Sequence, residues 1–252
     1  MKSQGLKFKQ AIQAETPLQI PGAVNAYTAM QVERAGFKAV YLSGGGVAYA
    51  SNGYPDLGIT DMHDVLEEAR KITATVDIPL LADTDVGWGG AFNIARTIKE
   101  MTRAGVAAVH MEDQIAQKRC GHRPNKELVS KAEMGDRIKA AVDGKTDPDF
   151  VIMARCDAFA NEGLEAMIER MIYYVDCGAD MLFAEAMNDL THYQTIKDAT
   201  GVPLLANITE FGKTDLYTTE DLKAHGVDMA LYPLSAFRAQ AKAAETVLGA
   251  IR

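Results

Sequence analysis

Residues 118–124 read Lys-Arg-Cys-Gly-His-Arg-Pro, and the first five gather two cations, a thiol and an imidazole. Pro124 disfavours helix for the residue before it, and Gly121 relieves the backbone beside the thiol, so we expect a loop that presents Cys120. Neighbouring cations favour the thiolate and can lower a cysteine pKa well below about 8.5. Cys120 could therefore give or take a proton near neutral pH. The alternative is a small apolar side chain beside an exposed basic loop.

Short apolar runs along the chain end on charged side chains. These are Asp83, Asp85, Glu112, Arg155, Glu185 and, just beyond the last run, Arg238. Each could be a helix cap or turn residue, but carboxylates that share one site repel each other unless a cation lies among them. Hard oxygen ligands without a Cys or His cluster indicate Mg²⁺ or Mn²⁺. The arginines could hold the carboxylates of a small, multiply anionic acid, so we expect a metal-assisted reaction with a thiol as proton carrier.

A junction that recurs four times organises the chain. At Gly36, Gly105, Gly178 and Gly226 a helical segment ends and a short apolar run follows. Glycine in this position can adopt the left-handed conformation that closes a helix, and the run after it is typical of a buried strand. Four more strands are expected at 19–26, 79–84, 150–155 and 203–207. Helices are expected at 2–15, 28–35, 61–75, 91–104, 130–142 with a capping box at 130–133, 163–176, 189–200, 218–224 and from 234 onward.

Strict alternation of short strands and amphipathic helices indicates a parallel sheet. Eight such units in 252 residues favour a closed (β/α)8 barrel, a TIM barrel, forming one domain over residues 1–252 with an extra N-terminal helix. An open doubly wound sheet is the alternative, but no G-x-G-x-x-G run follows the first strand. The Ser43-Gly44-Gly45-Gly46 run lacks a Lys-Ser/Thr ending, so we interpret it as backbone amides available to an anion.

Charge and composition argue against several classes of partner. The net charge is −8 and the basic residues do not gather on one helix, which disfavours nucleic acid and anionic membrane surfaces. No apolar run reaches the roughly 18 residues of a spanning helix, and the charged N-terminal segment is unlike a signal peptide. Three cysteines without metal-type spacing suit a reducing cytoplasm.

Six stretches of the chain resemble the isocitrate lyase and phosphoenolpyruvate mutase superfamily, and within it the 2-methylisocitrate lyases. They lie at 17–20, 41–46, 118–126, 145–155, 206–212 and 230–238, so the resemblance covers nearly the whole chain. The Cys-Gly-His core at 120–122 marks the lyase branch. The Lys-Arg-Cys form at 118–120, in place of Lys-Lys-Cys, resembles that of the methylisocitrate lyases.

The resemblance implies a retro-aldol cleavage of 2-methylisocitrate to pyruvate and succinate, a step of the methylcitrate cycle in propionate catabolism. It implies Mg²⁺ held by Asp83 and Asp85, with Mn²⁺ possible, and Cys120 as the acid that protonates the succinate fragment. Tyr41 would lie near the hydroxyl proton. The tricarboxylate substrate would be held by Ser43, Gly44, Gly45, Cys120, Gly121, His122, Arg155, Glu185, Asn207, Ile208, Thr209 and Arg238.

Substrate choice would depend on a small apolar patch formed by Phe183, Leu231 and Pro233. One methyl group is worth only about 1–3 kcal/mol in such a pocket, so some activity on isocitrate is expected. The alternatives within the superfamily are isocitrate lyase, an oxaloacetate hydrolase or decarboxylase, and a phosphonate mutase. Two further alternatives are a Schiff-base aldolase using Lys118 and a non-catalytic dicarboxylate-binding barrel.

The resemblance also bears on the end of the chain. Relatives continue through a helical tail that is exchanged between the subunits of a tetramer, so a homotetramer is expected and the C-terminal extension, ending at Arg252, is expected to be cut short. The last helix carries an apolar stripe that includes Phe237, Val247 and Leu248. We expect this stripe to pack on the barrel.

Overall fold

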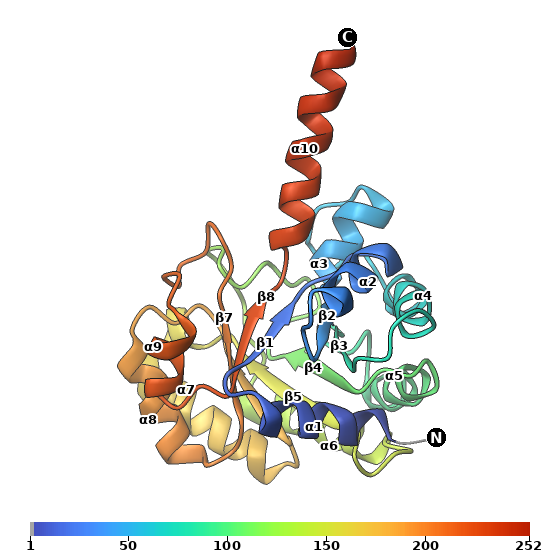
Figure 1. The fold of residues 1–252 in the computed structure, drawn as a ribbon. Coiled ribbons are helices and arrows are strands. Elements are labelled where there is room, and N and C mark those ends of the chain that lie inside the picture. Colours follow the sequence, from blue (N-terminus) through green and yellow to red (C-terminus); the bar gives the residue numbers. More distant parts are fainter. Residues whose placement is uncertain (1–2) are drawn as a thin grey trace.

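The computed structural model describes residues 3–252, and its strands form one parallel sheet (Figure 1). The strands are β1 Leu18–Pro21, β2 Val40–Leu42, β3 Leu80–Asp83, β4 Ala108–Glu112, β5 Val151–Cys156, β6 Met181–Ala184, β7 Leu204–Asn207 and β8 Met229–Tyr232. Their order is β1-β8-β7-β6-β5-β4-β3-β2, and a bridge between Gly22 and Tyr41 brings β1 beside β2. The sheet thus curves into a nearly closed barrel, which confirms the predicted (β/α)8 fold.

Helices alternate with these strands around the barrel. They are α1 Gln4–Ala14, α2 Ala26–Arg34, α3 Gly44–Val47, the π-helix η1 Ala48–Asn52, α4 Met62–Thr73, α5 Ala91–Arg103, α6 Lys131–Asp143, α7 Phe159–Asp176, α8 Leu190–Thr200, α9 Thr219–Ala224 and α10 Ser235–Ile251. The four junction glycines have φ between 74° and 106°, so the prediction that they close helices is confirmed. No helix was predicted where α3 and η1 lie.

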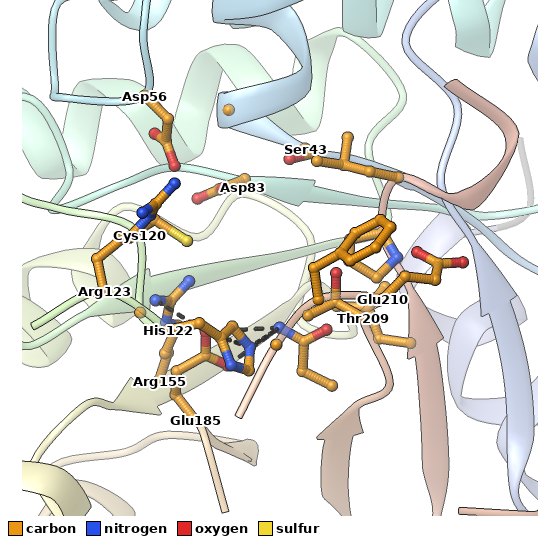
Figure 2. A pocket seen from close by; sticks show the side chains of 18 of the residues that line it. Ser43, Asp56, Asp83, Cys120, His122, Arg123, Arg155, Glu185, Thr209 and Glu210 are labelled. Atoms are coloured by element: carbon orange, nitrogen blue, oxygen red, sulfur yellow. Dashed lines mark hydrogen bonds and ion pairs between the residues drawn. The ribbon is translucent and has the colours of Figure 1, made fainter. Parts of the chain in front are cut away.

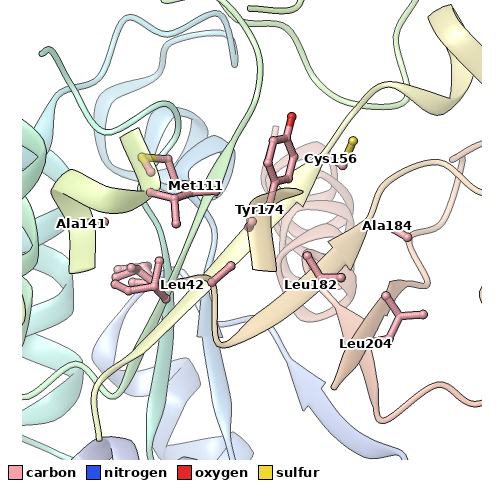
Figure 3. Packing of buried hydrophobic residues seen from close by; sticks show 14 of the residues in the cluster. Leu42, Met111, Ala141, Cys156, Tyr174, Leu182, Ala184 and Leu204 are labelled. Atoms are coloured by element: carbon pink, nitrogen blue, oxygen red, sulfur yellow. The ribbon is translucent and has the colours of Figure 1, made fainter. Parts of the chain in front are cut away.

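Successive side chains of each strand point alternately into the barrel and out toward the helices. Inward-facing residues such as Leu81 and Met153 form one buried cluster with Phe8 of α1, so α1 closes the end at which the strands begin. Outward-facing residues such as Leu182 and Leu204 pack in a second cluster with the surrounding helices (Figure 3). The two clusters hold the strands in register and leave the opposite end of the barrel for polar side chains.

Some predicted boundaries are wrong because local capping prevails over apolar patterning. The first strand stops at Pro21 instead of residue 26, since Asn25 already caps α2 by accepting a hydrogen bond from the Thr28 N–H at 2.9 Å. The capping box at 130–133 forms only in part. Ser130 accepts from the Glu133 N–H, but the Glu133 carboxylate accepts a bond from Arg137.

The last helix differs most from expectation. The prediction that its apolar stripe packs on the barrel is wrong, because α10 extends away from it (Figure 1) and contains no buried residue. Val247, Leu248 and Ile251 are 56%, 66% and 76% exposed. Within residues 3–252, no helix has the length and apolar character needed to cross a membrane.

Candidate active site

A cavity of about 530 Å³ opens at the end of the barrel where the strands finish, which we call the mouth (Figure 2). Strand register explains why distant residues meet there, since Glu112 pairs with Arg155 and Asn207 with Leu231. The predicted site residues that line the cavity are Tyr41, Ser43, Gly45, Asp83, Cys120, Gly121, His122, Arg155, Phe183, Glu185, Asn207, Thr209, Leu231, Pro233 and Arg238.

Three predicted site residues do not line the cavity. Gly44 donates its N–H to Oδ2 of Asp83 at 3.1 Å, so this amide is already used within the protein. Ile208 buries its side chain in the outer core cluster, because it faces the opposite way from its two neighbours in the sequence. Asp85 has φ 46° and turns its carboxylate toward Lys118 instead of continuing strand β3.

Arg155 lies at the centre of a buried ionic cluster. Its Nη1 lies 3.1 Å from Glu112 and its Nη2 lies 3.3 Å from Glu185, while Nε and Nη2 donate to Asp157 at 2.9 and 3.2 Å. The guanidinium also stacks over the ring of Phe183, with 5.2 Å from Cζ to the ring centroid. One planar cation thus orders three carboxylates and presents a charged edge to the cavity.

Lys118 lies between the carboxylates of two different loops. Its Nζ is 2.7 Å from Oδ1 of Asp85 and 2.5 Å from Oδ1 of Asp56. Although burial opposes its charge, Asp85, Glu112 and Asp56 raise the pKa of Lys118 well above its ordinary value. The side chain therefore stays an ammonium ion, which argues against a Schiff-base role, because that chemistry needs the free amine.

The carboxylates near Lys118 fit a hard divalent cation. Burial raises the pKa of Asp85 to about 6 and that of Glu112 well above its ordinary value. A cation close to these two carboxylates would therefore stabilise their ionised forms. Oε1 of Glu112 is buried without a hydrogen-bond partner among the described residues. No preformed cage of three His, Cys, Asp or Glu side chains occurs within residues 3–252. Mg²⁺ usually takes one or two carboxylates and completes its shell with water and substrate, and carboxylates are the donors that Asp85 and Glu112 offer.

Tyr41 and His110 form a buried aromatic pair beneath the carboxylates. The Tyr41 hydroxyl is 2.8 Å from Nε2 of His110 and 3.4 Å from Oδ2 of Asp83. Burial raises the pKa of Tyr41 well above its ordinary value and lowers that of His110 to about 4, so both groups are neutral near pH 7. Tyr41 is therefore equipped to donate a hydrogen bond and poorly equipped to remove a proton.

The expectation of a lowered pKa for Cys120 is wrong. Burial raises the pKa of this thiol, with further opposition from Glu185 and Asp56, although the His122 N–H and Arg155 favour the thiolate. Of the two adjacent cations, Lys118 is paired with carboxylates and Arg119 is exposed. Cys120 is thus a neutral thiol near pH 7, which is the form that can donate a proton.

Gly121 is needed for a different reason from the one expected. Its φ is not positive, but a Cβ there would lie 2.2 Å from Oε1 of Glu185 and 2.4 Å from Nη2 of Arg155. The glycine therefore lets the backbone beside Cys120 press against the Arg155 cluster. Any larger residue would push the thiol away from the cavity or displace the ion pair.

His122 joins two loops above the cavity. Its Nδ1 accepts a hydrogen bond from the Lys213 N–H at 2.9 Å, which leaves the proton on Nε2. Nε2 lies 3.4 Å from Oε1 of Glu185 and 3.2 Å from the Asn207 amide nitrogen. The neutral ring would carry its proton on the nitrogen that faces Glu185 and Asn207. Burial lowers the pKa of His122, consistent with that neutral form.

Sequence reasoning missed several residues of the mouth. Asp56 and Tyr49 come from the segment after β2, whereas Glu210 and Phe211 follow β7. Glu210 pairs with Arg238, whose Nη1 also donates to Oγ1 of Thr209 at 3.1 Å. Arg238 was expected to hold substrate, but part of its positive charge is already balanced by Glu210. Asp56 could not be assigned to the mouth from sequence, because it does not lie at the end of a predicted strand.

The raised pKa of Cys120 predicts how its alkylation depends on pH. The rate of reaction with iodoacetamide follows the thiolate fraction, so its midpoint should lie above that of Cys120 in the denatured chain, near 8.5. Mass spectrometry of the Cys120 peptide at a series of pH values measures this. A rate that reaches its plateau below pH 8 in the folded protein would contradict the neutral thiol.

The comparisons with known proteins agree with the resemblance read from the sequence. A family model described as phosphoenolpyruvate phosphomutase matches residues 8–252. The 2-methylisocitrate lyase of Shewanella oneidensis is 60% identical over 99% of this chain and 86% of its own length, and that of Escherichia coli is 58% identical over 100% and 86%. Resemblance to 2-methylisocitrate lyases is therefore confirmed.

Proteins of known structure with the same fold include enzymes with different activities. A 2,3-dimethylmalate lyase, described as a member of the PEP mutase/isocitrate lyase superfamily, superposes with a TM-score of 0.94 at 32% identity, covering 100% of this chain and 85% of its own. A phosphonopyruvate hydrolase in complex with oxalate and Mg²⁺ has a TM-score of 0.86 at 30% identity, covering 99% and 87%.

Proposed function

The chain belongs to the phosphoenolpyruvate phosphomutase family, and on that premise we propose that it is a 2-methylisocitrate lyase. The observation that carries the proposal is the 58–60% identity to 2-methylisocitrate lyases over nearly the whole chain. The solved superfamily members with other activities, such as oxaloacetate acetylhydrolase and 2,3-dimethylmalate lyase, share 32–35%. A thiol beside the Arg155 cluster is the matching chemical feature.

The proposed reaction is a retro-aldol cleavage in which no water is consumed. The C2 hydroxyl loses its proton and its oxygen becomes the carbonyl oxygen of pyruvate as the C2–C3 bond breaks. The electron pair of that bond stays on C3, and the Cys120 thiol protonates this carbon to give succinate. The proton taken from the hydroxyl returns to the Cys120 thiolate, so the balance closes after each turnover.

The other side chains of the mouth bind and orient the substrate in this proposal. Arg155 holds a carboxylate with its guanidinium edge, and the neutral Tyr41 phenol donates a hydrogen bond toward the C2 oxygen. Asp83 and Asp85 would hold Mg²⁺, with Glu112 nearby. Once bound there, the metal would stabilise the negative charge that develops on the substrate oxygens. The remaining contacts are assigned to Ser43, Gly45, Gly121, His122, Glu185, Asn207, Thr209 and Arg238.

Specificity for the methylated substrate is assigned to Phe183, Leu231 and Pro233, which all line the cavity. An apolar wall there accommodates the extra methyl group at little cost. The proposed setting is the methylcitrate cycle of propionate catabolism. We propose a cytoplasmic location, because the Cys120 thiol has to stay reduced in order to donate a proton.

We also propose that the protein is a homotetramer in which α10 packs against a neighbouring subunit. The exposed apolar residues Val247, Leu248 and Ile251 give this helix a surface that would be covered by such an exchange. Sedimentation velocity at micromolar concentration measures the assembly. A monomer across the concentration range would contradict the exchange.

The reaction itself is tested by supplying 2-methylisocitrate with Mg²⁺ and measuring both products. Pyruvate and succinate should form in equal amounts, and a chelator should abolish the reaction until Mg²⁺ or Mn²⁺ is added back in excess. Turnover that survives thorough chelation would contradict the metal requirement. Absence of both products with metal present would contradict the lyase assignment.

A further inference from the structure

Lys126 is a buried lysine close to the mouth to which neither the sequence nor the proposed reaction assigns a role. Its side chain is 1% exposed, and its Nζ donates to Oδ1 of Asp157 at 2.8 Å. Asp157 is completely buried and makes its other side-chain bonds with Arg155, to Nε at 2.9 Å and to Nη2 at 3.2 Å. One carboxylate thus joins Lys126 to the guanidinium that faces the cavity.

Lys126 belongs to the same loop as Cys120. We call residues 115–127 the Cys120 loop, and Lys126 lies near its C-terminal end. An isolated antiparallel bridge between Gln114 and Leu128 joins the two ends of this loop. The backbone of Lys126 is fixed as well, because its carbonyl oxygen accepts a bond from the Asn161 amide at 2.8 Å. The loop that carries the thiol is therefore anchored beside Arg155 through Lys126.

The charge balance shows what Lys126 contributes. Arg155 faces the carboxylates of Glu112, Asp157 and Glu185, and Lys126 is the second cation in contact with this group. The Asp157 N–H donates to Oδ1 of Asp113 at 2.8 Å, so the backbone of Asp157 cannot follow a shift of the guanidinium. Without Lys126, only Arg155 would hold the Asp157 side chain, so this side chain and the guanidinium could turn together and lose the contacts with Glu112 and Glu185.

We propose that Lys126 is a positioning residue that holds Asp157, and through it the Arg155 guanidinium, in the orientation that faces substrate while anchoring the Cys120 loop. A purely stabilising pair would be dispensable, since replacing a buried ion pair by apolar groups is often neutral for stability. The proposal rests on the proposed lyase function for its kinetic consequence. Its structural consequence, the anchoring of the Cys120 loop, can be measured without any turnover.

The test compares Lys126→Met with a matched control, Lys145→Met. Lys145 also forms an ion pair, at 3.2 Å from Asp180, but it precedes β5 at the end of the barrel far from the mouth. Lys126→Met should lower kcat by about 100-fold, the cost of a small misplacement of a catalytic group. Lys145→Met should leave kcat unchanged. A Lys126→Met enzyme with wild-type kcat, or equal losses in both variants, would overturn the proposal.

Alkylation of Cys120 by iodoacetamide gives the readout that needs no turnover. At fixed pH, Lys126→Met should react about tenfold faster at Cys120, because the loop opens more often. The buried Cys177 in the same molecule serves as an internal reference and should react at an unchanged rate. If the wild-type protein lacks lyase activity, this arm still decides the anchoring. Unchanged alkylation at Cys120 would overturn it.

The double variant Lys126→Met/Asp157→Asn keeps the test decisive if the single variant fails to fold. It leaves neither buried charge unpaired, so it should fold. If Lys126 acts through Asp157, the double variant should lose about as much activity as Lys126→Met, because both changes break the same link. A double variant with wild-type kcat would mean that the pair is only structural.

Discussion

Replacing Cys120 by serine is expected to lower kcat for 2-methylisocitrate cleavage by about 100- to 10,000-fold, the range for losing a positioned acid. The raised pKa of Cys120 keeps the thiol protonated near pH 7, yet a thiol is still a far stronger acid than a serine hydroxyl. Serine has nearly the same shape, so the substrate should bind with a similar Kd. The measurements are kcat by product formation and Kd by calorimetry.

The matched control for this variant is Cys177→Ser. Cys177 is also a free cysteine, but it caps the C-terminal end of α7, outside the mouth. Cys156, which is labelled in Figure 3, is a poorer control because its buried thiol donates to Oδ2 of Asp113 at 3.2 Å. Both serine variants should keep the Tm of the wild type to within a few degrees. A fully active Cys120→Ser enzyme would rule out the thiol as the acid.

Changing Arg155 to lysine is expected to lower kcat/KM by about 100- to 1,000-fold, because the charge remains but the fork is lost. An ammonium group can contact one or two of the three carboxylates, leaving the others buried without a partner. The free energy of unfolding should fall by about 3 kcal/mol for the same reason. Urea unfolding and steady-state kinetics measure the two effects on one preparation.

Arg170→Lys separates the two effects. Arg170 is buried to a similar degree and makes a bidentate pair with Glu162, with both bonds at 2.7 Å, but it lies outside the cavity. It should lose stability while keeping kcat per folded molecule. Equal losses of kcat in the two variants would mean that Arg155 acts through the fold and has no special contact with substrate.

Much of the fold was predictable because the strands of a barrel repeat one simple unit. The junction glycines marked the entries to four strands, and their positive φ values are a direct consequence of closing a helix. Once the strands were placed, their ends gave most of the mouth. Arg155 and Asn207 were found in this way, since both are inward-facing residues at the ends of buried strands.

What could not be predicted depends on contacts between loops. Asp56 reaches Lys118 only because the segment after β2 folds back over the mouth, and no local pattern records that contact. The pKa of Cys120 was misjudged because the sequence shows Lys118 beside the thiol, but neither the burial that raises the pKa nor the carboxylates that pair with Lys118. Lys126 and Asp157 are 31 positions apart, and nothing at either position marks the ion pair.

The behaviour of α10 has a different cause. Its apolar residues have helical spacing, and from sequence alone such a stripe is most often packed on its own domain. The helix begins beside the mouth, where Gln240 donates to Oγ1 of Thr28 at 3.1 Å, and then leaves the barrel (Figure 1). Which surface an amphipathic helix covers is set by geometry beyond its own sequence.

The most direct measurement is a paired assay with Mg²⁺ in which 2-methylisocitrate and isocitrate are each supplied and the keto acid formed from each is identified. We expect pyruvate from 2-methylisocitrate with a kcat/KM at least about tenfold higher than that for glyoxylate from isocitrate, the discrimination available from one methyl group. Comparable efficiencies would contradict the assigned specificity. Formation of neither keto acid would contradict the lyase function itself.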